Sequence, residues 1–70
     1  MSPADRLRQG VIGYPIETVA AALTDVLHLE LVGARLVALW ALEGPDDEGA
    51  PPLTDAQVDA ILARLRARLT

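Results

Sequence analysis

The chain has 70 residues, a formal net charge of −4 and no cysteine. This length allows one small domain, and the lack of cysteine excludes disulfides, thiolate zinc sites and thiol nucleophiles. A mean hydropathy of +0.28 argues against disorder. The most apolar stretch, residues 29–42, is shorter than the roughly 20 residues that cross a bilayer, and the first residues lack the apolar run of a signal peptide. We therefore expect a single domain, residues 1–70, in the cytoplasm and not in a membrane.

The first residues predict a short helix. Ser2 is suited to the N-cap, Pro3 to the first helical position and Asp5 to the first turn, where its charge complements the helix dipole. Gly10 is suited to ending this helix.

A second helix is expected to open at Pro15. Apolar residues follow it at the three- and four-residue spacing of one buried stripe, while Glu17 and Asp25 fall on the opposite side. The stripe consists of Ile16, Val19, Ala20, Leu23, Val26 and Leu27.

Residues 27–42 allow two interpretations. Residues 27–32 alternate as a strand does, and Gly33 could form a hairpin turn. An isolated hairpin is only marginally stable, however, and the segment from Leu31 or Val32 to Glu43 is rich in good helix formers. We predict a helix there, apolar on nearly every side and interrupted mainly by Arg35. Such a helix is normally enclosed by its neighbours, so we expect it at the centre of the bundle.

An acidic loop and a fourth helix complete the chain. Residues 44–53 contain glycines, prolines and an acidic cluster, which predict an exposed linker. Thr54 and Gln57 form a capping box, and Leu53 is placed to pack on Val58. We therefore predict an all-α fold, a small bundle of about four helices, with a three-helix part in residues 1–43 and an amphipathic C-terminal helix in residues 54–69.

Few residues could carry catalysis or bind a metal. His28 is the single histidine, and Asp25 lies three residues before it on the same helical face, whereas transition-metal sites generally need more than one imidazole or thiolate. Ser2 has no partner for a catalytic triad. We expect no enzyme activity, no metal and no cofactor.

Part of the chain resembles a helix-turn-helix. Residues 13–23 followed by residues 29–36 are similar to the motif of sigma-factor C-terminal domains and small phage or antitoxin regulators, with Thr24-Asp25-Val26 in a longer turn than usual. The resemblance covers about a third of the chain and implies a DNA-binding transcriptional regulator in which Arg6, Arg8 and Arg35 contact phosphate. The acidic net charge disfavours nucleic acid as the partner, because DNA affinity depends on clustered basic residues.

The stronger expectation is a protein–protein interaction module. A chain of this size has a small core, and a helix that is apolar all round exceeds what two neighbouring helices can cover. A homodimer or a heteromeric complex would cover the remainder. Leu31, Leu39 and Trp40 are the candidate interface residues, since Trp often anchors protein interfaces.

Overall fold

The computed structural model describes residues 2–44 and 51–69. They form four helices: α1 (Pro3–Gly10), α2 (Ile16–Leu27), α3 (Leu31–Glu43) and α4 (Asp55–Leu69). No strand occurs in the described residues. The predicted all-α fold is confirmed, and residues 31–43 are a helix rather than half of a hairpin.

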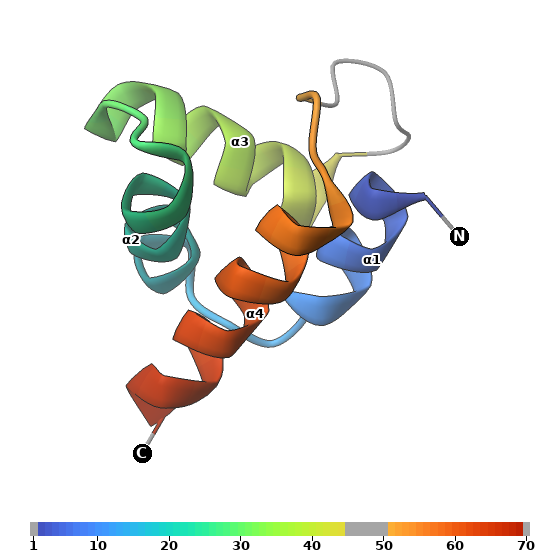
Figure 1. The fold of residues 1–70 in the computed structure, drawn as a ribbon. Coiled ribbons are helices and arrows are strands. Elements are labelled where there is room, and N and C mark those ends of the chain that lie inside the picture. The colour runs from blue at the N-terminus through green and yellow to red at the C-terminus, as the bar shows by residue number, and fades with distance from the viewer. Residues whose placement is uncertain (1, 45–50, 70) are drawn as a thin grey trace.

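The four helices are arranged as a ring (Figure 1). Helix α3 packs against α2 and α1, and α4 packs against the same two helices from the opposite side, while α3 and α4 do not pack on each other. The expectation that the third helix is central is therefore wrong. Because α3 forms one side of the ring, only one of its faces is covered.

The core lies inside this ring and is built from aliphatic side chains. Every helix contributes to it, and Val11 of the α1–α2 connection joins them. The buried residues are Leu7, Val11, Val19, Ala20, Ala22, Leu23, Ala34, Ala38, Ala41, Val58, Ile61 and Leu65. The stripe predicted for the second helix supplies Val19, Ala20 and Leu23, which confirms its orientation. The C-terminal helix, predicted to be amphipathic, supplies Val58, Ile61 and Leu65.

The helix starts follow the predicted capping rules. The Ser2 hydroxyl accepts a hydrogen bond from the Asp5 backbone N–H at 3.2 Å. At the start of α4, the Thr54 hydroxyl accepts from the Gln57 N–H at 3.1 Å, and the Gln57 side chain accepts from the Thr54 N–H at 2.9 Å. This reciprocal capping box satisfies backbone donors that the first turn leaves unpaired.

Gly10 has a role that the sequence did not indicate. It is the last residue of α1, and a Cβ atom at this position would lie 2.4 Å from a methyl carbon of Leu62. The absence of a Cβ atom therefore leaves room for the Leu62 side chain of α4 against the end of α1, and a larger residue at position 10 would require Leu62 to move.

Three residues connect α2 to α3. His28 ends α2 in the left-handed conformation, with φ of 57°, and Glu30 precedes the first turn of α3. Thr24-Asp25-Val26 lie within α2, so the long turn expected there is wrong. The Thr24 carbonyl oxygen accepts a hydrogen bond from the His28 N–H at 2.9 Å, at the C-terminal end of α2.

The predicted linker is only partly within the described residues. Residues 45–50, with the acidic cluster, lie outside them, whereas residues 51–54 are non-helical and lead into α4. None of the helices described combines the length and the apolar character needed to cross a bilayer.

Candidate functional site

Helix α3 buries small side chains and exposes large ones. Ala34, Ala38 and Ala41 are buried on the side that faces the bundle. Their spacing of four and three residues places them on one face, where small side chains allow the neighbouring helices to approach closely. Four bulky aliphatic residues of α3 lie on the outside, whereas Val37 and Leu42 are half-buried against the core.

The outer face of α3 is a largely apolar surface, defined here by six residues. Four are large aliphatic residues and two are charged. Leu31 is 57% exposed, Val32 70%, Leu36 63% and Leu39 42%, and Arg35 and Glu43 are exposed among them. At about 100° per residue, these positions span roughly 140° of the helix surface. The predicted interface residues Leu31 and Leu39 belong to this outer face.

Sequence reasoning missed Val32 and Leu36, the most exposed aliphatic residues of α3. Hydropathy alone cannot identify the buried side of a helix that has apolar residues on both its inner and its outer side. The signal that was available is the i, i+4, i+7 series of alanines, since small residues mark the side on which helices approach most closely.

Trp40 is at the edge of this surface and is only partly exposed. An open hollow of about 390 Å³ is lined by Leu36, Leu39, Trp40, Glu43 and Gly44. The Arg8 guanidinium lies over the indole ring, 5.5 Å from its centroid, and donates a hydrogen bond to the Gly44 carbonyl oxygen. A cation over the ring face holds Trp40 in place by electrostatic attraction. The hollow therefore has one wall that is fixed by α1.

Gly44 allows the chain to pass close to Trp40 at the end of α3. A Cβ atom at Gly44 would lie 2.4 Å from the Trp40 carbonyl oxygen and 3.1 Å from Cδ1 of its ring. The end of the hollow is thus shaped by backbone rather than by a side chain.

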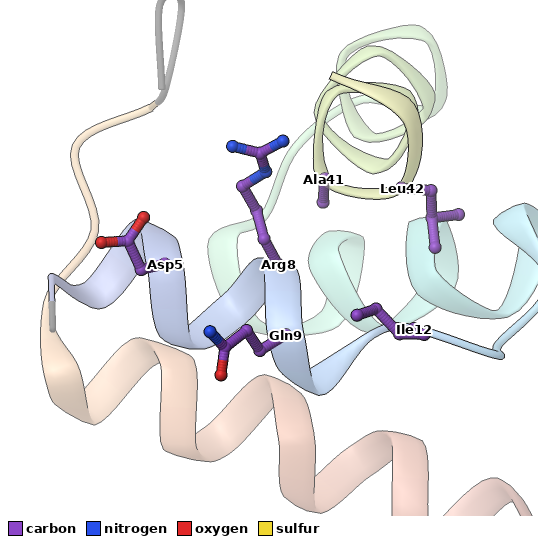
Figure 2. Close-up of a pocket in the computed structure, with 6 residues that line it drawn as sticks. All are labelled: Asp5, Arg8, Gln9, Ile12, Ala41 and Leu42. Atoms are coloured by element: carbon purple, nitrogen blue, oxygen red, sulfur yellow. The ribbon is translucent and has the colours of Figure 1, made fainter. Parts of the chain in front are cut away.

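A second hollow, of about 320 Å³, lies between α1 and the end of α3. In Figure 2, Arg8 lies on one side of α3, and Leu42 of α3 lies on the opposite side of that helix. Ile12 lies in the connection between α1 and α2. Ile12 is 73% exposed. The lining also includes Asp5 and Gln9. This mixture of polar and aliphatic groups makes the second hollow less apolar than the outer face of α3.

The three arginines proposed as phosphate contacts are held by different partners. Arg35 forms an ion pair with Glu17 of α2 at 3.1 Å. Arg6 binds Asp59 and Asp55 of α4, and these hydrogen bonds raise its pKa. All three ion pairs have carboxylates that are exposed to solvent, and ion pairs at the surface contribute little to stability.

Arg8, the third of these arginines, is directed to the end of α3. Arg6 is directed to α4 and Arg35 to α2. The fold therefore directs the three cations to three different elements, and they do not form one basic stripe.

The Asp25 carboxylate, considered above as a metal ligand with His28, is engaged by arginines. Arg68 lies 3.1 Å from it and Arg64 3.8 Å. These contacts join the C-terminal end of α4 to α2. Among the described residues, no group of three or more His, Cys, Asp or Glu side chains is arranged to hold a metal ion.

Comparison of the chain with protein-family models, with curated proteins and with solved structures finds no match.

Proposed function

We propose that this protein is a non-enzymatic interaction module, a small adaptor, regulator or assembly subunit that binds a protein through the outer face of α3. The observation that supports this proposal is the exposure of four large aliphatic side chains on one helix face, Leu31, Val32, Leu36 and Leu39. Contiguous apolar surface of this kind is typical of protein interfaces. A cytoplasmic location is part of the same proposal.

The exposed area is sufficient to matter energetically. The exposed fractions of the four side chains correspond to a little more than two fully exposed aliphatic residues. Covering them would contribute about 4–7 kcal/mol before the costs of association. Those costs are about 4–15 kcal/mol, so a partner must add an apolar surface of its own for stable binding. The proposed partner surface is therefore apolar, such as a helix face with aliphatic residues.

The outer face also contains a feature that suits a partner helix. The hollow beside Trp40 is lined by aliphatic and aromatic carbon on one helix, and its rim includes the charged Glu43. An aliphatic side chain of a partner could occupy this hollow, with polar groups around it. Interfaces commonly have this arrangement of an apolar centre and a polar rim.

A photo-crosslinking amino acid at position 36 tests the proposal in the cells that make the protein. The matched control carries the same amino acid at Ala63, which is exposed on α4 away from this face. We expect a discrete protein adduct from position 36 and none from position 63. Equal adducts from both positions, or none from either, would reject a contact function for α3.

A helix-turn-helix DNA-binding regulator is the second candidate. The three-residue connection between α2 and α3 favours it, because helix-turn-helix units have turns of three or four residues. The outer face of α3, which would enter the major groove, offers only Arg35 as a cation among the described residues. Retardation of a DNA duplex at low salt that is lost on Arg35→Ala would support this candidate over protein contact.

A further inference from the structure

We infer that the occupant of the outer face of α3 is the same face of a second copy of this chain, with the two α3 helices antiparallel and crossing at Leu39. This inference rests on the proposed contact function and specifies its partner. It is carried by the shape of the hollow and by the positions of the two charges on the face.

The hollow has the geometry of a hole for a helix side chain. Its lining residues on α3, Leu36, Leu39, Trp40 and Glu43, are at positions i, i+3, i+4 and i+7. Four residues at this spacing form the hole that receives one side chain of a facing helix in knobs-into-holes packing. Leu39 is 42% exposed beside this hole. In a two-fold arrangement, each Leu39 enters the hole of the other copy.

The two charges of the face are placed symmetrically about Leu39. Arg35 lies four residues before it and Glu43 four residues after it, so the three residues form one ridge along the helix. In an antiparallel pair, the ridge of one copy runs beside the reversed ridge of the other. Arg35 of each copy then lies opposite Glu43 of the other, and the dimer gains two reciprocal ion pairs.

The same charges define the direction of pairing. In a parallel pair, Arg35 would face Arg35 and Glu43 would face Glu43, which is repulsive. Within one chain, the two residues are eight positions apart, about 12 Å along the helix, and do not pair with each other. The antiparallel arrangement is thus the one that matches both the apolar hole and the charges.

Sedimentation equilibrium of the full chain tests this inference with charge-reversal variants. We expect the wild type to dimerise and R35E and E43R each to weaken dimerisation about tenfold, because each places like charges at two contacts. The double variant R35E/E43R should restore the wild-type dissociation constant to within about threefold. In a parallel dimer the single reversals would not add like-charge contacts, so unchanged affinity in both single variants would overturn the antiparallel register.

Three further variants separate the contribution of the outer face from general effects on the protein. Leu39→Ala removes the side chain that fills the hole and should weaken dimerisation at least as much as R35E. Ile12→Ala removes a comparably exposed aliphatic residue outside the face and should leave dimerisation unchanged. Glu17→Gln removes the intrachain partner of Arg35 and should not weaken the dimer. Equal effects of Leu39→Ala and Ile12→Ala would overturn the inference.

Failure of this inference is distinguishable from failure of the proposed function. A wild-type chain that remains monomeric up to millimolar concentration overturns self-association. If position 36 then crosslinks to a different protein, the contact function stands with another partner. If position 36 gives no adduct, both are rejected.

Discussion

The Arg8 guanidinium lies over the Trp40 ring and, through its hydrogen bond to the Gly44 carbonyl oxygen, connects α1 to the C-terminal end of α3. Arg8→Ala removes both interactions, and we expect a loss of about 1–2 kcal/mol in the free energy of unfolding. Urea denaturation followed by Trp40 fluorescence measures this loss. Arg66→Ala, at an exposed position of α4, is the control and should change stability little. Equal stability of the two variants would contradict the structural role of Arg8.

The orientation of α3 predicts opposite consequences of substitutions on its two faces. Ala38→Leu adds volume at a buried position and should destabilise the protein by about 1–3 kcal/mol. Leu36→Ala removes volume at a position that is 63% exposed and should change the stability of the dilute protein by less than about 0.5 kcal/mol. Thermal unfolding at low protein concentration measures both. A larger loss for Leu36→Ala than for Ala38→Leu would mean that α3 is turned the other way.

The capping box predicts a measurable contribution from Thr54. Thr54→Ala removes the hydroxyl that accepts from the Gln57 N–H and should cost about 1 kcal/mol. Thr54→Ser keeps the hydroxyl and is the matched control. Urea midpoints that are the same for Thr54→Ala and Thr54→Ser would show that the cap does not contribute to stability.

The left-handed conformation of His28 predicts a stabilising substitution. A residue with a Cβ atom is disfavoured at φ of 57°, whereas glycine adopts this conformation without steric cost. His28→Gly should therefore raise the free energy of unfolding by about 1 kcal/mol, after allowance for the greater freedom of glycine in the unfolded chain. Chemical denaturation checks this expectation, with His28→Ala as the control that keeps a Cβ atom. Lower stability of His28→Gly than of His28→Ala would contradict it.

Much of the fold was predictable because local signals agree with one another. Ser2 and the Thr54–Gln57 capping box mark helix starts, and the structure contains the corresponding hydrogen bonds. The second helix and the C-terminal helix each have apolar residues on one side and polar residues on the other, so their buried faces were unambiguous.

The position and orientation of α3 were not predictable by the same reasoning. Its hydrophobic residues surround the helix, so they predicted that it would be enclosed, whereas the structure places it on one side of the ring. The alanine series Ala34, Ala38 and Ala41 determines which face is buried. Close packing depends on the shape of the neighbouring helix, which a hydropathy pattern does not contain.

The candidate site was only partly predictable, because hydropathy identifies apolar residues but not which of them are exposed. Leu31 and Leu39 were identified from the apolar character of the segment, but Val32 and Leu36 are more exposed than either. Trp40 is partly buried against the core and held by Arg8. The contact with Arg8 joins residues 32 positions apart in sequence, and no local pattern indicates it.

Thiol accessibility tests the central claim, that the outer face of α3 is covered by protein, most directly. The chain has no cysteine, so Leu36→Cys and Ala63→Cys each introduce one thiol, on the outer face of α3 and on α4 respectively. We predict that the thiol of Leu36→Cys is alkylated several-fold more slowly in the cells that make the protein than in dilute purified protein, while that of Ala63→Cys reacts at the same rate in both. Equal cellular and purified rates for Leu36→Cys would contradict the account.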